Sequence, residues 1–450
     1  MRTAFVSRVR VRLGRAAPRG WEARIAVLAT VVAALFVVVD GVHEARTAPL
    51  YGLLDEVSHI GYAIAVADSG VPPVLGRDRI FVGGSAALAP RDVRVPPAEP
   101  GGAELPLGPF SELSQTEAIQ PPGAYYALAP VAALTGGRDR VVALRIACAV
   151  ALALTVLILA RFVWGLTGSS LGGALAAVAL TSCGGLIRVD SWVTNGSFVI
   201  LAAALLLWAL LDAYRRRIVT LRLSAAAAFL AITHLIVVPL ALAAMLVAAW
   251  RAWRPGRRRE IASRELLAAA PLALWVMSNL VRYRWPVPRN LGLATGGPGS
   301  TISTDYLKPG YIADNAYGSL SGGFYGAIQH WKASPFVYDW RPLGTLLPLA
   351  LAALGWCLFR GRARDRRAVG ALLVILVGAH LGIFAMLWLS VVTQGSGDYV
   401  FRYFGPTFVA GAAIMGATLG LALSRVRAGS LALAALCSMV LAFSIQSSPL

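Results

Sequence analysis

The sequence alternates between long runs of hydrophobic residues and shorter segments that carry almost all of its charge. A helix crosses the hydrocarbon core of a bilayer with roughly 20 mostly apolar residues. Nine runs come near that length: 24–42, 140–163, 169–187, 191–213, 262–281, 342–359, 368–393, 403–424 and 429–446. The pattern therefore predicts an all-α polytopic membrane protein.

A further apolar segment, residues 221–250, is too long for one ordinary span and short for two. It lies between the arginine triplets 215–217 and 257–259. We interpret it as two short helices that turn at Thr233 and His234, which brings the number of crossings to about eleven.

A rival threading crosses the membrane at 121–136 and makes 221–250 a single span. It places the Arg215 triplet on the opposite side. The apolar run from Gly123 to Leu134 has only a dozen residues, a length typical of re-entrant or interfacial segments. We therefore favour the first threading.

Composition and charge agree with a membrane protein. Hydrophobic residues make up 57% of the 450 residues and charged residues only 14%, against roughly 25% charged residues in soluble domains. The formal charge of +19 could indicate a nucleic-acid partner. In the favoured threading, however, the cytoplasmic segments carry +20 and the outer segments −1. Positive charge on the cytoplasmic side is the rule for membrane proteins, so the sequence implies no nucleic-acid partner.

The threading divides the chain into four parts. These are a cytoplasmic basic arm (1–23), an N-terminal transmembrane module (24–281), a second outer loop (282–341) and C-terminal transmembrane helices (342–450). The module includes a first outer loop, 43–139, with juxtamembrane helices. The basic arm precedes a span without a small-residue cleavage site, so we expect a retained anchor. The four cysteines fall inside apolar spans, where packing is their expected role.

The first outer loop opens with a segment of helical periodicity, residues 53–64. Asp55, His59 and Tyr62 share one stripe, and Leu53, Val57, Ile60 and Ile64 share another. We expect a short amphipathic helix at the bilayer surface, with the acids and the imidazole at the water boundary. A solvated polar face without chemistry is the alternative.

These residues are part of an ordered series of short motifs. The series runs from Asp55-Glu56-x-x-His59-x-x-Tyr62 through Gln120-Pro121-Pro122-x-x-Tyr125-Tyr126, Arg145, Asn195 and Thr233-His234 to Arg402-Tyr403-x-x-Pro406. It resembles the GT-C superfamily of integral-membrane glycosyltransferases, which take sugars from polyprenyl phosphates. The resemblance implies that Asp55, with Glu56 beside it, acts at the reaction centre.

The chemistry of such a transfer fits these residue types. A carboxylate takes the proton of the acceptor hydroxyl, and cations hold the charge of the departing polyprenyl phosphate. A single displacement inverts the anomeric centre. Two adjacent carboxylates repel each other, so either one has a raised pKa or a divalent metal bridges Asp55 and Glu56. Both alternatives stay open.

The candidate substrate-binding residues come from several segments of the chain. They are His59, Tyr62, Gln120, Tyr125, Asp190, Asn195, His234, Arg282, His330, Lys332, Arg402 and Tyr403. Three of them have a structural alternative: His234 as a hydrogen-bonded residue of a helix turn, Arg402 as a snorkelling side chain at the edge of a span, and Asp190 as the ion-pair partner of Arg188. The aromatic and glycine residues of the loop 282–341 predict either sugar stacking under a mobile lid or an interfacial belt.

The function predicted from the sequence is transfer of a hexosyl or pentosyl group from a polyprenyl-phosphate donor. The acceptor would be a cell-wall glycan, a glycolipid or a protein at the outer face of a bacterial plasma membrane. The alternative is a membrane transporter or flippase of lipid-linked sugars, which predicts ionisable groups in the middle of several spans. His380 is the one candidate of that kind that the threading gives.

Overall fold

The computed structural model of the protein describes residues 20–48, 56–75, 77–82, 92–95, 112–114, 118, 120–181, 191–284, 286, 341–394 and 405–423. The helices are α2 (Trp21–Thr47), α3 (Glu56–Ser69), α4 (Gly123–Leu134), α5 (Gly137–Thr167), α6 (Ser170–Thr181), α8 (Gly196–Arg216), α9 (Leu221–Thr233), η3 (Leu235–Val237), α10 (Val238–Ala252), η4 (Pro255–Arg257), α11 (Arg258–Tyr283), α14 (Arg341–Arg360), α15 (Ala363–Gln394) and α16 (Gly405–Leu423). The strands are β1 (Arg79–Val82), β2 (Val93–Val95) and β3 (Glu112–Ser114).

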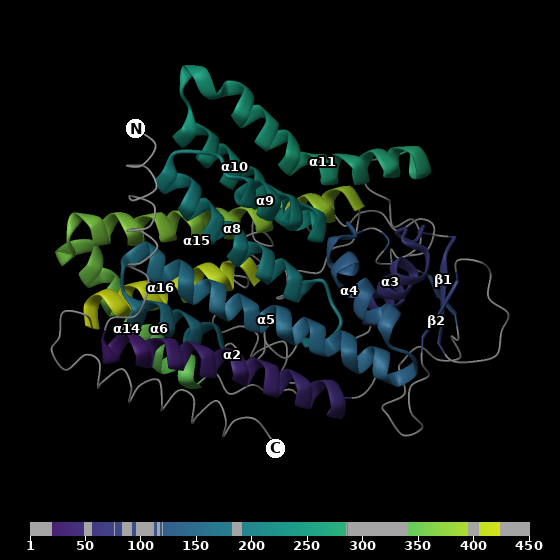
Figure 1. Ribbon diagram of the computed structural model, residues 1–450, viewed down its shortest axis with the longest axis horizontal. Helices are drawn as coiled ribbons and strands as arrows, with labels where there is room; N and C mark the ends of the chain where they lie inside the picture. The colour runs from purple at the N-terminus through teal and green to yellow at the C-terminus, as the bar shows by residue number, and fades with distance from the viewer. Residues whose placement is uncertain are drawn as a thin grey trace, which may run out of the picture.

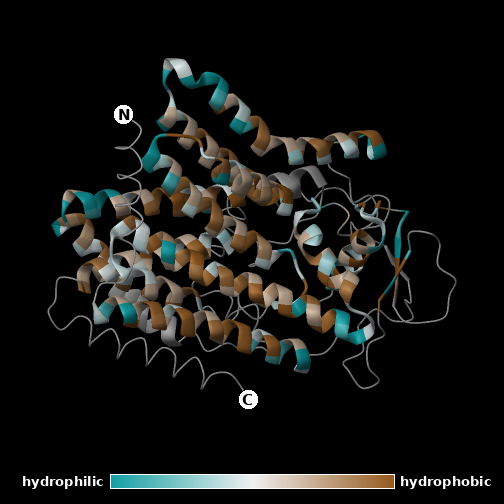
Figure 2. Ribbon diagram, viewed as in Figure 1, coloured by the Kyte–Doolittle hydropathy of each residue, from teal (hydrophilic) through white to brown (hydrophobic). Residues whose placement is uncertain are grey.

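The long helices form a bundle whose residues are mostly hydrophobic. Helices α2, α5, α15 and α16 run along the long axis of the molecule, and α3, α4, β1 and β2 gather at one end (Figure 1). Hydrophobic residues dominate the helices, and hydrophilic ones mostly lie near their ends (Figure 2). Within the described residues, seven helices are long and apolar enough to cross a membrane. The predicted multi-pass, all-α membrane fold is confirmed.

The pair of short helices predicted within 221–250 is present as α9 and α10. The chain breaks between them at His234, whose backbone is extended, and the short helix η3 follows. The Arg257 guanidinium donates to the carbonyl of Arg217, 3.1 Å away, so both ends of the hairpin meet. Its turn lies at the other end, where Ile232 touches Gly123 of α4. The rival threading, which separates the two arginine triplets by one span, is therefore wrong.

Arginines that are far apart in the sequence collect at one end of the bundle, which we call the arginine-rich end. Arg215 at the end of α8 donates to the carbonyl of Gly165 near the end of α5. Arg161 and Arg364 lie close enough to Arg215 to interact with its charge. Arg145, 20 residues before Gly165 on α5, lies toward the opposite end, about 30 Å away at 1.5 Å per residue. We call that opposite end the α3 end.

Helices α6 and α16 approach each other closely along small residues. A Cβ added at Gly416 would lie 2.4 Å from the backbone nitrogen of Ala176 and from the carbonyl oxygen of Gly172. Residues of α6 and α16 also share the main hydrophobic core with α2, α5 and α8. The two backbones can therefore meet at this distance only because position 416 has no side chain.

Helix α3 differs from the amphipathic surface helix expected from the sequence. Every residue from Glu56 to Val66 is buried, on both predicted stripes. The helix packs on α4 and on β1 and β2 of a small sheet. In this sheet β1 pairs with β2 in parallel and with β3 antiparallel. The expectation of a helix lying at the bilayer surface was wrong because these neighbours cover its polar stripe as well as its apolar one.

The two cysteines that the structure describes lie inside the bundle, as expected. Cys148 and Cys357 are fully buried. The sulfur of Cys357 lies 3.8 Å from the carbonyl oxygen of Thr418. Packing between helices accounts for both.

Matched glycine substitutions test the close contact between α6 and α16. We expect Gly416→Ala to lower the free energy of unfolding by about 1–3 kcal/mol, because the new methyl group overlaps the backbone of α6. In α15, a Cβ added at Gly378 meets no atom within 4 Å. Gly378→Ala should therefore change the same quantity by less than about 1 kcal/mol. Denaturant titration of the detergent-solubilised chain measures both, and equal losses would contradict the packing described here.

Candidate active site

A fully buried ion pair fixes the first residue of α3. Two nitrogens of the Arg145 guanidinium, Nε and Nη2, each donate to one carboxylate oxygen of Glu56 at 2.7 Å. Both side chains are completely shielded from solvent. Paired donors of this kind match the planar carboxylate in direction as well as in charge. The position and orientation of Glu56 are therefore set by a residue 89 positions further along the chain.

The same pair ties together the backbone at the α3 end. Arg145 Nη1 donates to the carbonyl of Ala48, directly after α2, at 3.1 Å. The backbone N–H of Val193 donates to Glu56 Oε1 at 3.1 Å, and the guanidinium lies 5.0 Å from the ring centroid of Trp192. The end of α2, the start of α3, helix α5 and the segment before α8 thus meet at one pair of charges.

Sequence reasoning named Glu56 but missed Arg145 and Trp192 as its partners. Arg145 lies inside an apolar run, between Leu144 and Ile146. An ionisable residue in such a run is a signal for a buried charge pair or a functional site. The signal was present, but the sequence does not indicate which of its acids would be the partner.

Four of the predicted substrate-binding residues lie together beside this pair. The rings of Tyr62 and Tyr125 stack with their centroids 3.7 Å apart. The Tyr125 hydroxyl lies 2.7 Å from His59 Nδ1, and the Tyr62 hydroxyl donates to the carbonyl of Gln120 at 3.2 Å. His59, Tyr62 and Tyr125 are all buried. The motif around residues 56–62 and the motif around 120–126 therefore form one packed unit of α3 and α4.

Asn195 and His234 occupy the starts or ends of helices near the same unit. Asn195 is buried and precedes α8, three residues after Trp192. His234 ends α9, and its Nδ1 accepts a hydrogen bond from the N–H of Ile236 at 3.2 Å. This hydrogen bond is of the kind expected if His234 has a structural role in the helix turn.

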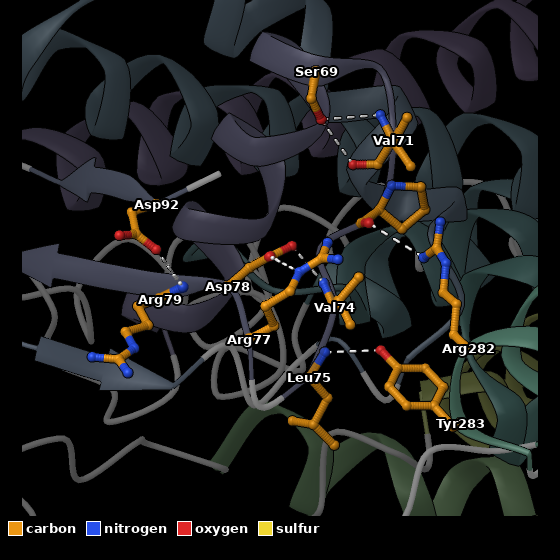
Figure 3. Close-up of polar contacts among 11 residues, drawn as sticks. Ser69, Val71, Val74, Leu75, Arg77, Asp78, Arg79, Asp92, Arg282 and Tyr283 are labelled. Atoms are coloured by element: carbon orange, nitrogen blue, oxygen red, sulfur yellow. Dashed lines mark hydrogen bonds and ion pairs between the residues drawn. The ribbon is translucent and has the colours of Figure 1, made fainter. Parts of the chain in front are cut away.

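The end of α11 is attached to the segment that follows α3, as Figure 3 shows. The N–H of Leu75 donates to the Tyr283 hydroxyl at 2.8 Å, and Arg282 donates to the carbonyl of Pro72 at 3.5 Å. Residues 72–75 and 282–283, which we call the clasp, join the first predicted outer loop to the point where the second begins. Arg282 therefore lies beside the first predicted outer loop.

Asp78 holds the clasp segment in shape (Figure 3). Its carboxylate accepts from the N–H of Val74 at 2.7 Å and from Nε of Arg77 at 2.9 Å. The hydrogen bond to Asp78 raises the pKa of Arg77 above its ordinary value. A neighbouring acid, Asp92, accepts from the N–H of Arg79 where β1 begins. These bonds connect the clasp to the small sheet.

Several predicted site residues lie outside the described residues. They are Asp55, Asp190, His330, Lys332, Arg402 and Tyr403. Within the part of the chain that is described, no group of three or more His, Cys, Asp or Glu side chains could hold a metal ion. The possible metal bridge between Asp55 and Glu56 therefore stays a hypothesis from the sequence.

Breaking the buried pair should cost much more than breaking an exposed one. We expect Glu56→Gln to lower the free energy of unfolding by about 3–5 kcal/mol, because it removes the carboxylate charge that pairs with the fully buried Arg145 guanidinium. Asp212→Asn removes the exposed pair between Asp212 and Arg216 and should cost less than about 1 kcal/mol. A double variant, Glu56→Leu with Arg145→Met, should cost less than Glu56→Gln alone. Denaturant titration compares the three, and equal effects of Glu56→Gln and Asp212→Asn would be inconsistent with this buried pair.

Comparison with known proteins identifies the fold. No protein-family model and no curated protein sequence matches the chain. Among solved structures, the chain is similar to ArnT from Cupriavidus metallidurans bound to undecaprenyl phosphate, with a TM-score of 0.50 and 16% sequence identity. The match covers 93% of this chain and 63% of ArnT, so the chain spans less than two thirds of that protein's length. ArnT is a GT-C glycosyltransferase, and the protein described here shares the all-α, multi-pass membrane fold of ArnT.

Proposed function

We propose that the protein is a GT-C glycosyltransferase that moves one hexosyl or pentosyl group from a polyprenyl-phosphate donor to an acceptor at the outer face of a bacterial plasma membrane. The acceptor would be a cell-wall glycan, a glycolipid or a protein. The fold shared with ArnT, a protein whose structure holds undecaprenyl phosphate, supports the donor class. The clustering of two sequence motifs at the α3 end supports the position of the site.

The observation that carries this proposal is the buried pair of Glu56 and Arg145. Both oxygens of Glu56 accept hydrogen bonds from Arg145, and one also accepts from the N–H of Val193. Because both of its oxygens are already engaged by these hydrogen bonds, we assign Glu56 the role of a positioning residue. Asp55, the preceding residue in the chain, is the base in this proposal.

The proposed reaction is a single displacement. Asp55 takes the proton of the acceptor hydroxyl while the hydroxyl oxygen attacks the anomeric carbon of the sugar. The bond between that carbon and the phosphate oxygen breaks, and the polyprenyl phosphate leaves with the electron pair. The anomeric centre is inverted. The candidates to stabilise the phosphate charge are Arg282, His330, Lys332 and Arg402, with Tyr403 beside Arg402.

The remaining candidates fall into two groups: residues that shape the site and residues that contact the acceptor. Tyr62 and Tyr125 are stacked and fully buried, so in this proposal they and His59 shape the site through α3 and α4 rather than by stacking on the sugar. Gln120, half-buried at the entrance to α4, and Asp190 are proposed contacts of the acceptor. Asn195 and His234 set the ends of helices beside them.

Asp55→Asn should abolish sugar transfer while leaving insertion and stability unchanged, because an amide cannot take the proton of the acceptor. Asp68→Asn is the matched control: Asp68 is an exposed acid of α3, the helix that begins one residue after Asp55 in the sequence, and its variant should keep full activity. The assay incubates membranes with a panel of lipid-linked sugars and follows the released polyprenyl phosphate. Full activity of Asp55→Asn would remove Asp55 as the base. Movement of lipid-linked sugar across the membrane without transfer to an acceptor would favour the transporter or flippase alternative.

Cysteine labelling tests the proposed orientation. A cysteine at position 190 should react with a membrane-impermeant maleimide added from outside, whereas a cysteine at position 216 should not. Arg216 is exposed at the arginine-rich end, which we propose to be cytoplasmic because positive charge favours that side. The chain without added cysteines controls for the native thiols, and labelling at 216 alone would reverse the orientation.

A further inference from the structure

One exposed face of α5 carries a row of hydrophobic residues, which we call the apolar track, and leads to a group of arginines. Val150, Leu154 and Leu157 are exposed hydrophobic residues, and at spacings of four and three residues they lie on one face of the helix. The same spacing continues to Arg161, Gly165 and Gly168. The face therefore changes from apolar to cationic as it reaches the arginine-rich end.

Two further arginines, from other helices, reach this face. Arg215 of α8 donates to the carbonyl of Gly165. A guanidinium nitrogen of Arg364, from the first turn of α15, lies 3.5 Å from the position that a Cβ would take at Gly168. Arg161 is on the face itself, with its guanidinium 5.5 Å from the ring centroid of Trp164. Three cations from three helices thus meet at the end of α5.

Little negative charge offsets these three cations. Within the described residues, no ion pair joins Arg161, Arg215 or Arg364 to an acid. Asp212 attracts Arg215, but its carboxylate is paired with Arg216. Three like charges repel one another, and an anion among them would remove that repulsion.

The length of the track indicates what kind of anion fits. Eleven residues separate Val150 from Arg161, which is about 17 Å of helix, or about half of the roughly 30 Å thickness of the hydrocarbon core. An acyl chain in one leaflet occupies that depth, and its phosphate lies at the level of the arginines. We infer that Arg161, Arg215 and Arg364 bind the phosphate of an anionic phospholipid whose acyl chain lies along Val150, Leu154 and Leu157. This lipid site lies at the opposite end of α5 from the proposed active site and is independent of it.

Native mass spectrometry of the detergent-solubilised full chain tests this inference. The probe is phosphatidylglycerol, compared with phosphatidylcholine of the same chain length. We expect the unaltered protein to retain phosphatidylglycerol preferentially. The double variant Arg161→Gln/Arg364→Gln should bind it roughly 25-fold more weakly, from about fivefold per arginine near a membrane surface. These two arginines are exposed, and the variant keeps the bond of Arg215 to α5.

The matched control removes the same charge elsewhere at the same end. Arg254 and Arg259 are exposed, and Arg254→Gln/Arg259→Gln should retain phosphatidylglycerol as the unaltered protein does. Equal loss in the two double variants would show a general attraction to the charged end and would overturn the site. Equal retention of phosphatidylcholine would overturn the selectivity for an anion. Displacement of the lipid by inorganic phosphate would overturn the role of the apolar track.

Discussion

The fold at the α3 end depends on the burial of Glu56 and Arg145 as one unit. Each charge alone would be very costly to remove from water, and each makes the burial of the other possible. The pair joins residues that are 89 positions apart, so the packing of α3 depends on its contact with α5. A helix that looks amphipathic by its sequence is thereby enclosed on both of its faces.

The sequence predicts the bundle well because the length and composition of each apolar run determine whether it crosses a membrane. It also predicts the break at His234, since a run of about 30 residues between two arginine triplets is best divided into two helices. The small sheet was missed because β2 and β3 have three residues each, too few to show a periodic pattern. The burial of α3 was missed because the hydrophobic pattern says nothing of which distant cation will neutralise an acid.

The candidate site was predicted in part for the same reason. The grouping of His59, Tyr62, Gln120 and Tyr125 follows from two short motifs that the sequence made visible. Arg145 was visible as a charge within an apolar run, but its direction, toward Glu56, depends on how α3 and α5 cross. Sequence periodicity describes one helix at a time, whereas this contact depends on two.

The clasp has a consequence for how such a protein can change over evolutionary time. Tyr283 and Arg282 bind the backbone of residues 72–75, so the start of the second predicted outer loop is attached to the first. Exchange of either loop with that of another protein would replace only one side of the clasp. The two outer loops are therefore expected to vary together, although the sequence encodes them far apart.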